Sequence, residues 1–156
     1  MKQPKSKLIR TLIWLGGILG GLVLVYFIAM SVMMSRMGEV PADLDYSTTR
    51  VSDNGLFKVS YSASTGTVPV NQMYQWTLHV ESGDGQPMED ATITVDGDMP
   101  QHGHGLPTSP RVTQNLGNGD YLVDGLKFQM GGWWVMDFTV TEGGQIDAVH
   151  FNMMLK

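Results

Sequence analysis

Residues 134–155 read WVMDFTVTEGGQIDAVHFNMML. Apolar residues take every second position over 134–140 and again over 149–155. Alternation with a period of two is typical of a strand that buries one face. One acidic residue and two glycines, at 142–144, stand between the two runs and favour a turn. The stretch therefore predicts two half-buried strands with a turn between them.

Shorter blocks of the same alternation recur upstream, separated by turns rich in glycine, aspartate and asparagine. They cover residues 57–61, 74–80, 91–95 and 121–123, with a weaker block at 112–116. No stretch after the first 36 residues has a sustained helical period. We therefore predict an all-β fold, an immunoglobulin-like antiparallel sandwich of about seven strands, for the C-terminal part of the chain.

The N-terminal part has a different composition. Residues 11–35 carry no charge and are mostly leucine, isoleucine, valine, methionine and glycine. At about 1.5 Å per helical residue, this run exceeds the roughly 30 Å hydrocarbon layer of a bilayer. We expect a transmembrane anchor over residues 11–36, preceded by a cytoplasmic N-terminus at 1–10. Residues 37–53 are expected to form a tether, and residues 54–156 an exported β-domain.

Four cationic residues, Lys2, Lys5, Lys7 and Arg10, precede the apolar run. By the positive-inside rule they keep the N-terminus in the cytoplasm, so that the β-domain is periplasmic or otherwise extracytoplasmic. The expected location is the bacterial inner membrane, with a single span. A cleaved signal peptide is the competing interpretation, but its apolar region is usually about 7 to 15 residues long. We favour a retained anchor and leave open whether the segment is ever cleaved.

The charge of the exported part limits its partners. All 15 acidic residues lie after the apolar run, and with five basic residues from Arg50 onward the net charge there is about −10. That sign argues against nucleic acid as a partner, because phosphate contacts need basic residues. It suits solubility, or attraction to a basic partner protein. The chain has no cysteine, which excludes disulfides and metal sites built on thiolates.

One loop, residues 98–107, departs from ordinary turn composition because it holds two of the four histidines. In an extended backbone, His102 and His104 point to the same side, so both imidazoles can reach one ion at about 2 Å. Met99 adds a thioether beside them, and Met130 can supply a second. Imidazole with thioether is a soft ligand set that suits copper, particularly Cu(I). The sequence thus predicts a copper site formed by Met99, His102, His104 and Met130.

Other interpretations of these residues stay open. The two histidines can make hydrogen bonds in a surface loop, and the methionines can fill the core, as most methionines do. Zinc is the second candidate metal, held by Asp98, His102 and His104. His79 and His150 fall on the polar phase of their strands and are expected to face solvent.

Three short motifs in order also carry a family resemblance: Met99-Pro100-x-His102-x-His104-Gly105, Gly119-x-Tyr121, and Phe128-x-Met130-x-Gly132-x-Trp134. With the strands around them they cover roughly residues 57–141. On these motifs the chain resembles the YtkA-like and FixH-like exported domains found in bacteria. The resemblance implies an immunoglobulin-like sandwich, copper handling, and assembly of haem–copper respiratory oxidases. It also implies that Met99, His102, His104 and Met130 hold the copper. The anchor and tether do not resemble those of FixH proteins, so the likeness is confined to the exported domain.

Together these observations predict a membrane-anchored periplasmic copper-binding protein, a chaperone or a metallation and assembly factor for a respiratory oxidase. Its expected partners are the membrane and a respiratory complex or another copper acceptor protein, with no nucleic acid and no small-molecule substrate. The alternative is a non-metal accessory or structural subunit of a membrane respiratory complex. The sequence contains no recognisable Ser-His-Asp arrangement and no phosphate-cradling glycine loop, so we do not expect an enzyme.

Overall fold

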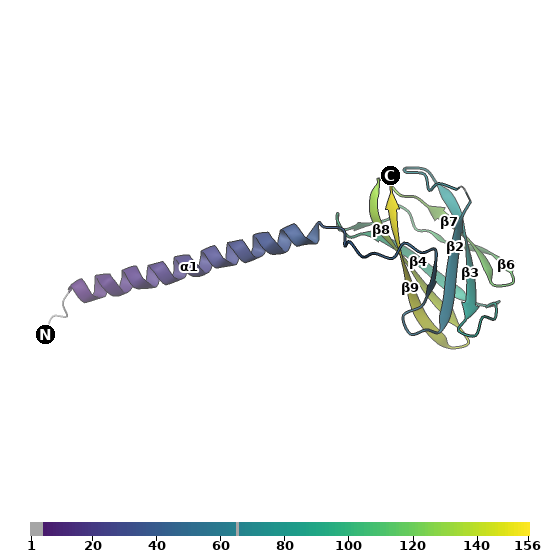
Figure 1. Cartoon of the computed structure of the whole chain (residues 1–156), viewed down its shortest axis with the longest axis horizontal. Coiled ribbons are helices and arrows are strands. Elements are labelled where there is room, and N and C mark those ends of the chain that lie inside the picture. The colour runs from purple at the N-terminus through teal and green to yellow at the C-terminus, as the bar shows by residue number, and fades with distance from the viewer. Residues whose placement is uncertain (1–4, 65) are drawn as a thin grey trace. The chain divides into compact units, whose positions relative to one another are not determined.

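The computed structural model describes residues 5–64 and 66–156 (Figure 1). The chain divides into two compact units between Glu39 and Val40. The first unit is helical, and the second is a β-domain.

Helix α1 extends over Lys5–Met37. Its segment Leu12–Met34 has 23 residues, and none of its most apolar window is buried. At about 1.5 Å per residue this segment is about 35 Å long, which is enough to cross the hydrocarbon core of a bilayer. The helix has the length and composition of a membrane span or of a signal sequence.

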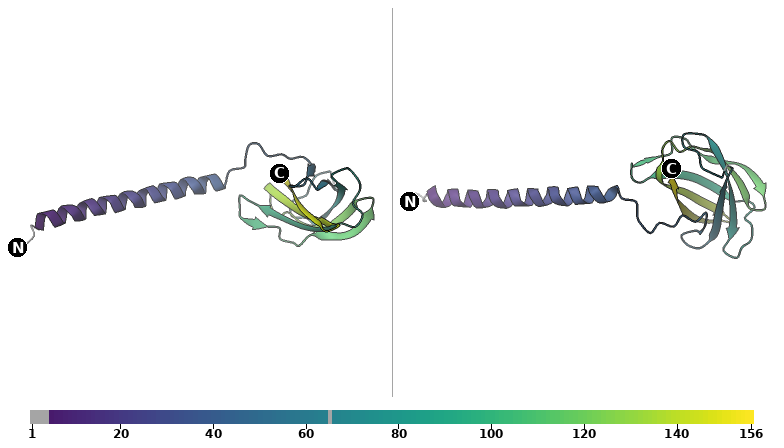
Figure 2. Two further views of the ribbon diagram at one scale, coloured as in Figure 1. Left: turned by 90° about the horizontal axis from the view of Figure 1, so that it is seen from below. Right: turned by 45° about the horizontal axis from the view of Figure 1, so that its top comes forward.

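The described part of the β-domain has nine strands in two antiparallel sheets (Figure 1). The first sheet has the order β1-β2-β3-β7-β6, with β1 at Thr49–Val51, β2 at Phe57–Ala63, β3 at Tyr74–Ser82, β7 at Asp120–Leu126 and β6 at Arg111–Gly117. The second has the order β5-β4-β8-β9, with β5 at His104–Gly105, β4 at Thr92–Met99, β8 at Gly132–Glu142 and β9 at Gln145–Leu155. Figure 2 gives two further views of the same strands. The arrangement confirms the predicted antiparallel sandwich preceded by one apolar helix.

The β8–β9 hairpin corresponds to the alternating stretch at the end of the chain. Gly143 and Gly144 connect its strands with φ values of 58° and 80°. Two residues with positive φ are typical of a type I′ turn, whose twist matches the twist of the flanking strands. The register then places Met136 opposite Phe151, and both side chains are fully buried. The inward positions of the two strands thus belong to one core, as the alternation predicts.

Aromatic side chains connect the two sheets in this core. The ring centroids of Trp76 in β3 and Phe138 in β8 lie 6.2 Å apart. Phe128, just after β7, meets Trp134 of β8 edge to face at 5.0 Å. All four side chains are fully buried. Aromatic pairs at these separations add to the free energy gained from burial alone.

Two of the nine strands are additional to the seven that the alternation predicts. Strand β1 lies within residues 37–53, the expected tether, and it pairs with β2 through Arg50 opposite Val59. Strand β5 lies inside the histidine loop, where His104 is opposite Met99 of β4. Strands of two or three residues are too short to show a period, so pairing with a neighbour is what identifies them.

Asp147 holds the start of the folded region against β9. Its carboxylate is 4% exposed and accepts hydrogen bonds from the backbone N–H of Asn54 (2.9 Å), the Asn54 side-chain amide (2.8 Å) and the backbone N–H of Ala148 (2.9 Å). Burial alone raises the pKa of this carboxyl group, but the hydrogen bonds, including one from Ser52, outweigh burial and lower the pKa to about 2. The segment that enters the domain is therefore fixed by a buried charge.

Candidate metal centre

The two histidines of the loop lie on the β4–β5 hairpin, at the edge of the second sheet. The carbonyl oxygen of Met99 accepts hydrogen bonds from the backbone N–H groups of His102 and Gly103, both at 2.9 Å. Gly103 has a φ of 65°, a conformation that glycine adopts without strain. These contacts close a tight turn over residues 100–103. The turn places His102 near its tip and His104 in β5, so the backbone between the two is folded back rather than extended.

The turn nevertheless brings the two imidazoles close together. Their ring centroids are 5.9 Å apart and their planes are inclined by 32°. A metal bound at about 2 Å from a ring nitrogen lies about 3 Å from the ring centre, so two rings that share one ion have centres about 5–6 Å apart. The observed separation of His102 and His104 is in that range. His102 is exposed, whereas His104 is half-buried.

His104 is held by three neighbours. Its ring and the Trp134 ring form an edge-to-face pair with a centroid distance of 5.8 Å. Its Nδ1 atom lies 3.1 Å from the carbonyl oxygen of Gly105 and 3.0 Å from the Nε2 atom of Gln129. Because protein groups occupy Nδ1, Nε2 is the ring nitrogen through which His104 can bind a metal. A histidine ligand whose other ring nitrogen is hydrogen bonded is usual at metal sites.

Met99 is packed in the end of the core. Its side chain is 1% exposed, and its terminal methyl group lies so close to Gly132 that a side chain at that glycine would collide with it. Its backbone is the cross-strand partner of His104. Met99 therefore fills the core, which is one of the two roles that the sequence left open. Its role as a copper ligand stays a prediction.

Met130 is more accessible, with an exposed fraction of 37%. Its carbonyl oxygen accepts a hydrogen bond of 3.1 Å from the indole N–H of Trp134. Trp134 thus contacts both the backbone of Met130 and the ring of His104. The backbone of Met130 therefore lies in a segment that contacts His104 through Trp134. Two imidazoles and a thioether would fit Cu(I), since a thioether is a soft ligand and imidazole also binds copper.

Across residues 5–64 and 66–156, no three His, Cys, Asp or Glu side chains gather in a way that could hold a metal ion. Asp98, the third ligand of the zinc alternative, is exposed in β4 with its backbone opposite Gly105. The zinc alternative therefore gains no three-residue ligand set from the described residues.

The other two histidines are paired with carboxylates, which the expectation of simple solvent exposure did not include. The Nδ1 atom of His79 lies 2.7 Å from Asp120. His150 lies between Asp137, 2.6 Å from Nδ1, and Asp53, 3.1 Å from Nε2. The hydrogen bond to Asp137 is the main reason why the pKa of His150 is raised. A correct prediction of strand register would have identified two of these pairs, because His79 is directly opposite Asp120 and His150 is directly opposite Asp137.

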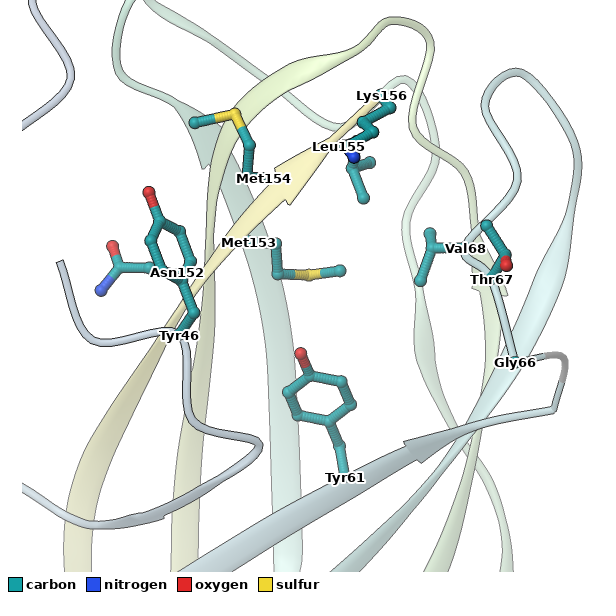
Figure 3. Close-up of a pocket in the computed structure, with 10 residues that line it drawn as sticks. All are labelled: Tyr46, Tyr61, Gly66, Thr67, Val68, Asn152, Met153, Met154, Leu155 and Lys156. Carbon is teal, nitrogen blue, oxygen red and sulfur yellow. The ribbon is translucent and has the colours of Figure 1, made fainter.

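A separate cleft of about 410 Å³ opens between the end of β9 and strand β2 (Figure 3). Figure 3 shows the hydroxyl group of Tyr61 and the thioether of Met153 directed into it. The Tyr61 ring stacks on Trp76 at 4.2 Å, and burial raises the pKa of its phenol. Among the described residues that line the cleft there is no histidine and no acidic residue. It is therefore distinct in chemistry from the histidine hairpin.

Comparison with protein families assigns the β-domain to a family. Residues 49–139 match the YtkA-like family, from β1 into β8. The chain belongs to the YtkA-like family. The matched segment of this YtkA-like chain contains all four residues predicted to hold copper, and the FixH-like part of the resemblance stays a prediction. Searches of curated proteins and of solved structures gave no match.

Proposed function

We propose that this YtkA-like protein is a membrane-anchored, periplasmic copper-binding protein that captures Cu(I) and passes it to an acceptor in the membrane. The observation that carries the proposal is the pair of imidazoles 5.9 Å apart on the β4–β5 hairpin. Met130, 37% exposed in the segment next to Gln129, is the candidate for a further, soft thioether ligand.

The proposed ligands differ in how firmly they are held, and this difference favours the transfer of copper to an acceptor. His104 is held by Trp134, Gly105 and Gln129, so it keeps its place whether or not copper is present. His102 and Met130 are exposed, so they can release the ion one bond at a time while ligands of the acceptor replace them. Copper keeps its oxidation state in such an exchange, because bonds to ligands are all that change. A fully enclosed site would bind the ion and not release it.

Location and recipient follow from the N-terminal segment and the family resemblance. The apolar helix, with cationic residues before it, supports an anchor whose β-domain lies outside the cytoplasmic membrane. The resemblance to FixH-like domains motivates a haem–copper respiratory oxidase as the recipient, with this chain as a metallation and assembly factor. The net negative charge of the domain favours an acceptor with a basic surface.

The alternative function is a non-metal accessory or structural subunit of a respiratory complex. The observation in its favour is that His104 already has hydrogen-bond partners within the protein. The hairpin is therefore a defined structure without metal and can serve as a docking element.

The test is an anaerobic titration of the full chain, in detergent or nanodiscs, with Cu(I) in competition with a chromophoric chelator. We expect tight one-to-one binding that is abolished when His102→Ala and His104→Ala are combined. His79→Gln is the matched control, because it removes a histidine paired with carboxylates and should leave the affinity unchanged.

Near-ultraviolet circular dichroism of each variant checks that the sandwich is intact. Unchanged Cu(I) affinity in the folded double variant would exclude the proposed site. Binding of Zn(II) without Cu(I) would favour the zinc alternative, and no metal binding by the native chain would favour the accessory subunit.

A further inference from the structure

Gln129 joins the two segments that carry the proposed ligands. It lies half-buried between β7 and β8, next to Met130, and its amide reaches the β4–β5 hairpin. Its Nε2 atom lies 3.0 Å from Nδ1 of His104 and 3.4 Å from the carbonyl oxygen of Gly105. Its Oε1 atom is buried and has no hydrogen-bond partner. A buried amide oxygen without a partner is costly, which calls for an explanation.

The chemistry of a neutral imidazole limits what this contact can be. One ring nitrogen carries a proton and the other carries a lone pair. When the Gln129 amide donates to Nδ1, the ring proton of His104 must be on Nε2. A metal ion, however, needs the lone pair of Nε2, which places the proton on Nδ1. The contact with the Gln129 amide N–H and a metal-bound ring therefore require opposite tautomers, whereas the Gly105 carbonyl oxygen, 3.1 Å from Nδ1, accepts a hydrogen bond only from the tautomer that leaves Nε2 free.

A half-turn of the amide resolves the conflict. Rotation about the last side-chain bond of Gln129 exchanges the positions of Nε2 and Oε1. The oxygen then accepts a hydrogen bond from a protonated Nδ1, together with the Gly105 carbonyl oxygen 3.1 Å away. The same movement gives Oε1 a partner and carries Nε2 into the buried position that Oε1 leaves. The ring carries one proton before and after the change, so only the position of that proton and the direction of one hydrogen bond differ.

We propose that Gln129 is the positioning residue of the copper site, because its amide selects which nitrogen of His104 is free to bind the ion. The part that concerns copper rests on the proposed function. The part that concerns the tautomer does not, since Gln129 and Gly105 compete for Nδ1 of His104 in the metal-free protein. Gln129 also ties the segment that contains Met130 to the hairpin, so one side chain orients an imidazole and links the two segments that carry the proposed ligands.

The test compares the full chain with Gln129→Glu and Gln129→Leu. A carboxylate can only accept a hydrogen bond, so it should move the proton of His104 to Nδ1, whereas leucine can neither donate nor accept. Nitrogen-15 NMR of the metal-free proteins at about pH 8, where histidine is ordinarily neutral, reports the tautomer directly. We expect the Nε2–H form in the native protein, the Nδ1–H form in Gln129→Glu, and a mixture in Gln129→Leu.

Cu(I) affinity supplies the second measurement. We expect Gln129→Leu to weaken binding by about 10–100-fold, which is the usual effect of losing a hydrogen bond to a ligating histidine. Gln129→Glu should bind at least as tightly as the native protein. Gln114→Leu, which replaces an exposed glutamine on β6, is the matched control and should change neither measurement.

The outcomes separate the two proposals. The same His104 tautomer in the native protein and in both the Gln129→Glu and Gln129→Leu variants would overturn the role of Gln129, whatever copper does. Native affinity in Gln129→Leu would overturn it as well. If the native chain binds no Cu(I), the proposed function fails, while the NMR comparison still decides whether Gln129 sets the tautomer.

Discussion

The second sheet contains two hairpins that are held together in different ways. The β8–β9 hairpin pairs eleven residues in each strand around a two-glycine turn, and its inward side chains are buried. The β4–β5 hairpin has only two residues in its second strand, and polar contacts of Met99, His104 and Gln129 hold it. The comparison indicates that the buried core contacts and the two histidines proposed as ligands reside in separate hairpins of one sheet. Substitutions should therefore affect one without the other.

The largest effect should come from the buried hairpin. Phe138→Ala removes a ring that contacts both Trp76 and Phe151 in the core. We expect a loss of about 3–5 kcal/mol in the free energy of unfolding, measured by chemical denaturation. Ile146→Ala is the control, because Ile146 lies in the same hairpin but is 63% exposed, and it should change stability by less than about 0.5 kcal/mol. Similar losses in the two variants would contradict the assignment of the core.

A smaller effect is expected where the two hairpins touch. Gly132→Ala introduces a side chain that collides with the Met99 methyl group at a residue with a φ of 124°. A backbone conformation with this φ costs a residue other than glycine about 1–3 kcal/mol. The collision with Met99 adds to that cost. The loss should be smaller in a Met99→Ala background, because the collision is then absent. Gly66→Ala, at an open position, is the control for denaturation measurements. Equal losses with and without Met99 would show that the contact is unimportant.

Asp147 makes the stability of the buried hairpin depend on pH. Its folded-state pKa of about 2 is below the ordinary value of 3.8, so the folded state binds this proton more weakly than the unfolded state. Its contribution to stability is therefore complete above about pH 4 and is lost as the pH falls from 4 towards 2. Melting temperatures of the native protein and Asp147→Asn should differ at pH 6 and converge near pH 2. A constant difference across this range would rule out the ionised carboxylate as the cause.

The smallest effect on stability is expected at the histidine hairpin itself. His102 is exposed near the tip of its turn, so His102→Ala should change the free energy of unfolding by less than about 0.5 kcal/mol. The same substitution should weaken Cu(I) binding clearly in the competition assay. A large loss of stability from His102→Ala would mean that the two hairpins are not separable.

The amino-acid sequence by itself determined the apolar helix, most of the strands and the buried face of each. Hydrophobic length and a period of two are local properties, and a strand buries alternate residues whichever strand it pairs with. The composition of the 98–107 loop likewise singled out His102 and His104 before any contact was known.

Only the tertiary structure decided what surrounds those histidines. Met99 and Met130 look equivalent in sequence, yet one is buried against Gly132 and the other is 37% exposed. Gln129 had no distinguishing signal, because it meets His104 across 25 positions of chain. The hydrogen bonds between Asp147 and Asn54 were hidden for the same reason, whereas strand β5 was hidden because a strand of two residues is too short to show a period. Contacts between distant segments depend on how strands pack and pair, and no local pattern contains that information.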